Sequence, residues 1–177
     1  MVRPRNRGAT LLVASTMALA ATLSGCAGQE QSGSAATRVS TWLRSGGGGS
    51  GIGNVEVASK NVDLALSQHN KPAAIKQVCA FLSNTAQSAI GNLPTPDEQL
   101  TAALNAAYVV GTSAGDDCYH GAGGDIGLLA RSAAERSKLF TLLAVAIRRA
   151  TAVTGRTPTT DTTSPPTVGG DPFAGGQ

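Results

Sequence analysis

The chain has 177 residues, of which 14 are Lys or Arg, 11 are Asp or Glu, and only 3% are aromatic. The three excess cations are Arg3, Arg5 and Arg7, so residues 26–177 carry no net charge. A neutral chain lacks the basic surface on which nucleic-acid binding depends, and it has no polybasic segment to supplement a membrane anchor. Because alanine fills many apolar positions, we expect closely packed helices with little room for a large internal cavity.

The N-terminus has the pattern of a secretory signal. The three arginines precede Ala9–Gly25, a stretch of 17 residues without a charge that ends in small residues, and this order is typical of a signal peptide. A stretch of that length is at the short limit for spanning a bilayer. We therefore expect residues 1–25 to be a cleaved leader. An ordinary signal that leaves Cys26 free and an uncleaved anchor are the alternatives.

The end of this leader, Leu23-Ser24-Gly25-Cys26, resembles the lipobox of bacterial lipoproteins. The resemblance implies that the thiol of Cys26 receives a diacylglycerol and that a dedicated peptidase cuts just before it. Two acyl chains hold a protein stably on a bilayer, whereas one chain holds it only marginally. The resemblance therefore implies a protein anchored through the lipid on Cys26 to the outer face of the cell membrane.

Beyond Cys26 the chain changes from spacer to ordered domain. Residues 26–33 are small and polar, as in a flexible spacer. Residues 34–44 place apolar side chains, Trp42 among them, on one face of a short amphipathic helix. The glycine run at 46–53 lacks the Gly-Lys-Ser/Thr ending of a phosphate-binding loop. We expect it to form a mobile connector.

Two helices are predicted after the glycine run. Asn54 can cap the first, which ends near Asn70. Pro72 suits a first helical position and opens the second, which stops at Gly91. Apolar residues recur at helical spacing in both. The predicted inward positions are Val55, Ala58, Val62, Ala65, Leu66, His69, Ile75, Val78, Cys79, Leu82, Ala86, Ala89 and Ile90.

Two further helices have N-terminal signals. Thr95-Pro96-Asp97-Glu98 is a capping box, in which the Thr95 oxygen accepts an amide proton at Glu98. Asp125 caps the last helix, and Arg148 and Arg149 lie favourably near its negative end. The predicted inward positions are Leu100, Ala103, Leu104, Ala107, Tyr108, Gly111, Ala114, Leu128, Leu129, Ala133, Leu139, Phe140, Leu143, Ala146, Ile147 and Ala150.

These elements predict an all-α domain at residues 34–155, a small bundle of four main helices with a short leading helix. The C-terminal residues 156–177 are mainly Thr, Pro, Gly and Ser, with little apolar area to bury. Such a segment cannot offset its ordering entropy, so we expect a disordered tail. The lipobox, the alanine-rich helices and the tail together resemble small lipoproteins of mycobacteria and related actinobacteria.

If lipid modifies Cys26, Cys79 and Cys118 remain as an even pair in a compartment that permits disulfides. We expect one bridge, with two buried free thiols as the alternative. The geometry is demanding, because a straight fourth helix would carry Cys118 about 33 Å from Pro96, while Cys79 lies about 18 Å from Gly91. We therefore expect the fourth helix to end near Gly111–Gly115 and Cys118 to return on a loop; steeply crossing helices are the alternative.

The only polar cluster that could form a metal site or an active site is Asp116-Asp117-Cys118-Tyr119-His120, followed by Asp125. Its order does not fit a calcium loop, and zinc would need two ligands beyond Cys118 and His120. The chain also has no nucleophile motif and no paired carboxylates for acid–base work. We predict no catalytic residue, no metal site and no cofactor.

The predicted function is a lipid-anchored, non-catalytic module that binds or scaffolds an envelope protein or polymer through a surface around Trp42 and the glycine run. An alternative is a small carrier of apolar envelope molecules, held between the leading helix and the bundle with the glycine run as hinge. A second alternative is an envelope hydrolase, for which Asp117 and His120 are the remaining candidates.

Overall fold

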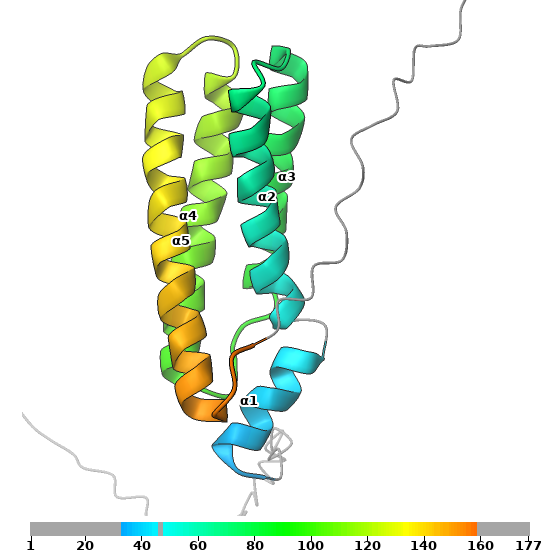
Figure 1. Cartoon of the computed structure of the whole chain (residues 1–177), viewed down its shortest axis with the longest axis vertical. Helices are drawn as coiled ribbons and strands as arrows, with labels where there is room; N and C mark the ends of the chain where they lie inside the picture. The colour runs from blue at the N-terminus through cyan, green and yellow to red at the C-terminus, as the bar shows by residue number, and fades with distance from the viewer. Residues whose placement is uncertain (1–32, 46–47, 159–177) are drawn as a thin grey trace, which may run out of the picture. The chain divides into compact units, whose positions relative to one another are not determined.

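The computed structural model describes residues 33–45 and 48–158, which belong to one compact unit, and in this part of the chain all regular structure is helical (Figure 1). The predicted all-α bundle with a short leading helix is confirmed. The predicted leader, the lipidated Cys26, most of the spacer and most of the tail lie outside the described residues. The helices are α1 (Ala35–Arg44), α2 (Gly49–Ser67), α3 (Pro72–Ile90), α4 (Glu98–Gly121) and α5 (Ile126–Thr154).

The four long helices run antiparallel to their neighbours in chain order (Figure 1). The α4 helix packs along both α3 and α5, and α2 packs mainly on α3. The α1 helix lies at the end of the bundle where α5 finishes, and it packs chiefly on α5. We call this end the α1 end. The opposite end, the tip, contains the α2–α3 and α4–α5 links.

The start of α2 departs from the prediction. The helix begins at Gly49 instead of Asn54, and Gly49, Gly51 and Gly53 are buried helical residues. The mobile connector is therefore wrong for residues 49–53. Gly48, the residue just before the helix, allows close packing of α1, because a Cβ on Gly48 would lie 2.5 Å from the Trp42 ring.

The fourth helix also departs from the prediction. It continues through Gly111 and Gly115 to Gly121, so Cys118 lies within a helix and the expected returning loop is wrong. A Cβ on Gly111 would lie 3.1 Å from the Ala86 Cβ, and one on Gly115 would lie 2.5 Å from the Ser83 backbone nitrogen. These glycines permit close packing of α4 on α3 instead of ending the helix.

The register of α3 and α4 explains how the two cysteines meet. Gly111 lies opposite Ala86, and Cys118 lies opposite Cys79. The same register places Ile90, the end of α3, level with Ala107, so the start of α4 extends about 14 Å beyond α3. The seven-residue link from Gly91 to Asp97 can span that distance, since seven extended residues reach about 23 Å.

The N-terminus of α4 is capped by a different residue from the predicted one. The Asp97 carboxylate accepts the Leu100 amide proton at 2.7 Å, and the helix begins at Glu98. Thr95 instead orders the preceding turn, where its hydroxyl bonds the Asp97 carbonyl at 2.7 Å. An ionised cap forms the stronger bond, which favours Asp97. Pro72 is the first residue of α3, as predicted, and the predicted cap at Asp125 is confirmed.

Small side chains dominate the core between these helices. Every long helix contributes buried alanines, and Tyr108 is the largest side chain among the fully buried residues. Most predicted inward positions are buried or partly buried. Ala133 is exposed, contrary to the prediction, and His69 is exposed at the tip. The inward stripe of α5 instead includes Ser132 and Arg136.

Candidate functional site

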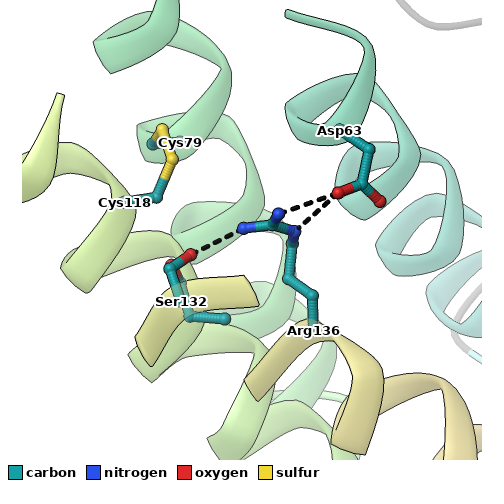
Figure 2. The surroundings of a disulfide bond; sticks show 6 residues. Asp63, Cys79, Cys118, Ser132 and Arg136 are labelled. Carbon is teal, nitrogen blue, oxygen red and sulfur yellow. Dashed lines mark hydrogen bonds and ion pairs between the residues drawn. A yellow bond between two sulfur atoms is a disulfide. The ribbon is translucent and has the colours of Figure 1, made fainter. Parts of the chain in front are cut away.

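The predicted disulfide joins α3 to α4. Cys79 and Cys118 are bonded with their Cα atoms 5.5 Å apart, and neither residue is exposed (Figure 2). The bridge lies on the same face of α4 as Gly111 and Gly115, since the spacing of three and four residues keeps them together. It therefore fixes the two helices next to Gly115, where the α4 backbone packs closely on the α3 backbone.

A buried arginine lies close to the disulfide in Figure 2. The Arg136 side chain is 5% exposed, and its guanidinium donates to one Asp63 oxygen through Nε at 3.2 Å and Nη2 at 2.8 Å. Its Nη1 donates to the Ser132 hydroxyl at 2.7 Å, and Ser132 donates to the Ala114 carbonyl at 2.7 Å. This network ties α5 to α2 and α4.

The network satisfies a charge that would otherwise be costly to bury. Asp63 keeps contact with water, because its side chain is 56% exposed. Sequence reasoning missed Arg136, although Ser132, Arg136, Leu139 and Leu143 follow the spacing of one helical face. Arg136 has a structural role. Three of its nitrogens donate to protein groups, and its ion pair with Asp63 links α5 to α2, two helices that otherwise have little contact.

The predicted polar cluster lies on the last turns of α4, where it makes structural contacts. Arg131 of α5 donates to both carboxylate oxygens of Asp117, and this hydrogen bonding holds the pKa of Asp117 below its usual value. Asp116 accepts a hydrogen bond from the Ser83 hydroxyl at 2.7 Å. Asp125 caps α5 through the Leu128 amide at 3.0 Å.

Glu135, one turn of α5 beyond Arg131, is the one carboxyl near this cluster with an upward shift. Burial raises its pKa, and the negative charge of Asp117 raises it further. Its Oε2 atom is buried and has no hydrogen-bond partner among the described residues. The pKa values of Glu135 and Asp117 therefore shift in opposite directions. Asp117 is held in an ion pair with Arg131.

The tip carries exposed aromatic and apolar groups. Tyr119 is 40% exposed, and Ile126, the first residue of α5, is 80% exposed. The Lys76 ammonium lies 5.3 Å from the Tyr119 ring centroid, and the His120 ring meets Tyr119 edge-on at 5.5 Å. The last turn of α4 therefore presents the Tyr119 ring together with the polar groups of Lys76 and His120.

The sequence predicts a binding surface around Trp42 and the glycine run, and the structure describes Trp42 and residues 48–53 of that region. The Trp42 side chain packs against the core, and its Nε1 donates to the Asn92 carbonyl at 3.3 Å. This bond ties α1 to the α3–α4 link. Residues 49–53 of the glycine run belong to α2, so in the structure they are helical.

A groove of about 450 Å³ lies at the α1 end, between the end of α1 and the segment after α5. Two arginines, Arg44 and Arg156, line it together with three hydroxyl side chains. Neither arginine forms an ion pair with another described residue. The full lining is Ser40, Leu43, Arg44, Thr154, Arg156, Thr157 and Pro158.

Within residues 33–45 and 48–158, no helix is long and apolar enough to cross a bilayer, and no group of three or more His, Cys, Asp or Glu side chains could hold a metal ion. Comparison of the whole chain with protein-family models, curated proteins and solved structures found no match. The lipobox resemblance of Leu23–Cys26 thus stays a prediction.

Proposed function

We propose that this protein is a lipid-anchored, non-catalytic binding module on the outer face of the cell membrane, and that it presents its tip to an envelope protein or polymer. The anchor rests on the sequence Leu23–Cys26. The binding surface rests on one observation: Ile126 is 80% exposed at the end of the bundle that also exposes Tyr119.

The fold suits this role. The α1 helix, which is nearest in sequence to the proposed anchor, lies at the opposite end from the tip. The 24-residue α4 helix spans about 36 Å between the two ends. The disulfide and the Arg136–Asp63 pair cross-link the helices, so the surface is pre-organised and little freedom is lost when a partner binds.

The groove at the α1 end gives less support to a carrier of apolar molecules. Five of its seven lining residues are polar or charged, and only Leu43 and Pro158 are apolar. A site for an acyl chain would be lined mainly by apolar side chains. The carrier therefore ranks below the binding module.

The anchor is tested in cells by comparing the protein with its Cys26→Ala variant. Membranes are washed in about 1 M salt, where the Debye length of about 3 Å removes electrostatic attachment. We expect the wild-type protein to stay in the membrane fraction and the variant to be released. Retention of the variant after this wash would contradict the lipid anchor.

The tip is tested with a photo-crosslinking residue placed at position 126. The matched control places it at Val145, which is 40% exposed on the flank of α5. We expect a defined partner to be crosslinked from position 126 and not from position 145, and an Ile126→Asp change to prevent its binding. The same products from both positions would contradict a binding surface at the tip.

A further inference from the structure

Folding gathers basic residues at the α1 end, although residues 26–177 are neutral overall. At this end, α1, the α3–α4 link, the first turn of α4, the last turns of α5 and residues 155–158 together contain five arginines against Asp97 and Glu98. Arg149 is paired with Asp97. The five are Arg38, Arg44, Arg148, Arg149 and Arg156.

The groove lies within this basic region, and its lining suits a phosphate group. Arg44 and Arg156 supply two guanidinium groups without an ion pair to another described residue. Planar guanidinium groups bind phosphate through paired hydrogen bonds, and the Ser40 and Thr157 hydroxyls can donate further. Leu43 and Pro158 add a small apolar part to the same lining.

The proposed anchor brings this end of the molecule close to lipid headgroups. Cys26 lies eight residues before Ser34, the N-cap of α1. Eight residues reach at most about 28 Å. A bilayer that holds the lipid on Cys26 is therefore within reach of α1, and the surface of a membrane that contains anionic lipids attracts basic groups.

We propose that the groove binds the phosphate of an anionic phospholipid headgroup in the membrane to which Cys26 is anchored. This step rests on the proposed function, because the anchor supplies the membrane. The contact holds the α1 end against the bilayer and directs the tip away from it. A lipid on Cys26 alone would not fix the orientation of the bundle relative to the membrane.

The test uses residues 26–177 with Cys26→Ala, so that no acyl chain contributes to binding. This chain keeps the whole core, whose residues lie between Val39 and Ala150. Binding to vesicles of phosphatidylglycerol and of phosphatidylcholine is measured by sedimentation. Trp42, the only tryptophan, adjoins the groove residue Leu43 and reports binding by its fluorescence.

The variant pair is Arg44→Gln with Arg156→Gln, and the charge-matched control is Lys71→Gln with Lys138→Gln. Each basic residue at an anionic surface contributes to binding, so we expect the arginine pair to weaken phosphatidylglycerol binding about 30-fold and the control to weaken it no more than about twofold. The control lysines lie outside the groove. Lys71 lies at the tip, and Lys138 lies in α5, 16 residues or about 24 Å before the end of the helix at Thr154. Both lie more than a Debye length from a membrane at the α1 end, so salt screens them.

Three outcomes would overturn the headgroup site: equal binding to both lipids, an equal loss in the control pair, or a Trp42 response to inorganic phosphate without any to vesicles. The anchor is judged separately, by the salt-resistant membrane retention of wild-type protein and release of Cys26→Ala. If the protein binds phosphatidylglycerol vesicles but is not retained on membranes, the headgroup site stands and the lipid anchor is refuted. If the protein is retained on membranes but does not bind the vesicles, the anchor stands and the headgroup site is refuted.

Discussion

Replacement of Gly115 by alanine tests the close approach of α3 and α4. The new Cβ would lie 2.5 Å from the Ser83 nitrogen, 2.8 Å from the Cys79 oxygen and 2.8 Å from the Ser83 Cα. All three are backbone atoms, so no side-chain rotation can relieve the contact. The helices must separate locally, next to a disulfide that restrains them.

Two effects of opposite sign set the magnitude. Alanine gains about 1 kcal/mol over glycine in a helix, and overpacking costs about 1–3 kcal/mol where side chains can adjust. Because only backbone can move at Gly115, we expect the cost at the upper end and a net loss of about 2 kcal/mol in the free energy of unfolding. For a domain of this size the loss lowers the Tm by about 8 °C.

The assay is thermal and urea unfolding of residues 26–177, with two matched glycine variants. Gly111→Ala should cost less, because its Cβ meets the Ala86 side chain at 3.1 Å. Gly123→Ala should be near neutral, because no heavy atom lies within 4 Å of its Cβ. A Gly115→Ala protein as stable as Gly123→Ala would refute the close approach of the two helices.

Three further predictions concern the cross-links of the bundle. Replacing Cys79 and Cys118 with serine should lower the free energy of unfolding by about 4 kcal/mol, because the bridge closes a loop of 39 residues. Arg136→Met should change it by less than about 1 kcal/mol, since the half-exposed partner carboxylate can rehydrate, whereas Arg136→Ala should cost about 3 kcal/mol because it leaves a cavity. The third prediction concerns pH. Hydrogen bonding to Arg149 lowers the pKa of Asp97 in the folded protein. The ionised Asp97 therefore stabilises the fold above about pH 4, and this stabilisation is lost as the pH falls through the folded pKa. Asp97→Asn keeps a capping oxygen, so its stability deficit should shrink as the pH falls.

Each of these has a distinct contrary result. Unchanged unfolding midpoints with and without reductant would contradict a stabilising disulfide. Equal losses in Arg136→Met and Arg136→Ala would mean that the charge itself, and not the packing of its side chain, supports the fold. A deficit of Asp97→Asn that stays constant between pH 7 and about pH 3 would contradict an ion pair whose strength depends on the charge of Asp97.

Local sequence signals predicted the start of three helices. Pro72 and Asp125 act through bonds or geometry confined to one helical turn, and both lie where the sequence places them. The short leading helix also begins within one residue of its predicted start at residue 34. The capping box was displaced because two neighbouring residues, Thr95 and Asp97, can both cap a helix. Arg149, which is 52 residues away, favours Asp97, and no local pattern contains that contact.

Sequence by itself thus determined the helical class and most of the buried stripes, because periodicity is a property of the chain alone. It predicted the pairing of Cys79 with Cys118 only on the premise that lipid modifies Cys26, and the structure shows the bridge. Tertiary structure decided the role of Gly111 and Gly115, since a glycine weakens an isolated helix yet permits close packing when another helix lies against it. It also decided that Arg136 is buried and that arginines far apart in the chain gather at the α1 end. Both depend on which helices become neighbours, and that is fixed only when the whole core packs.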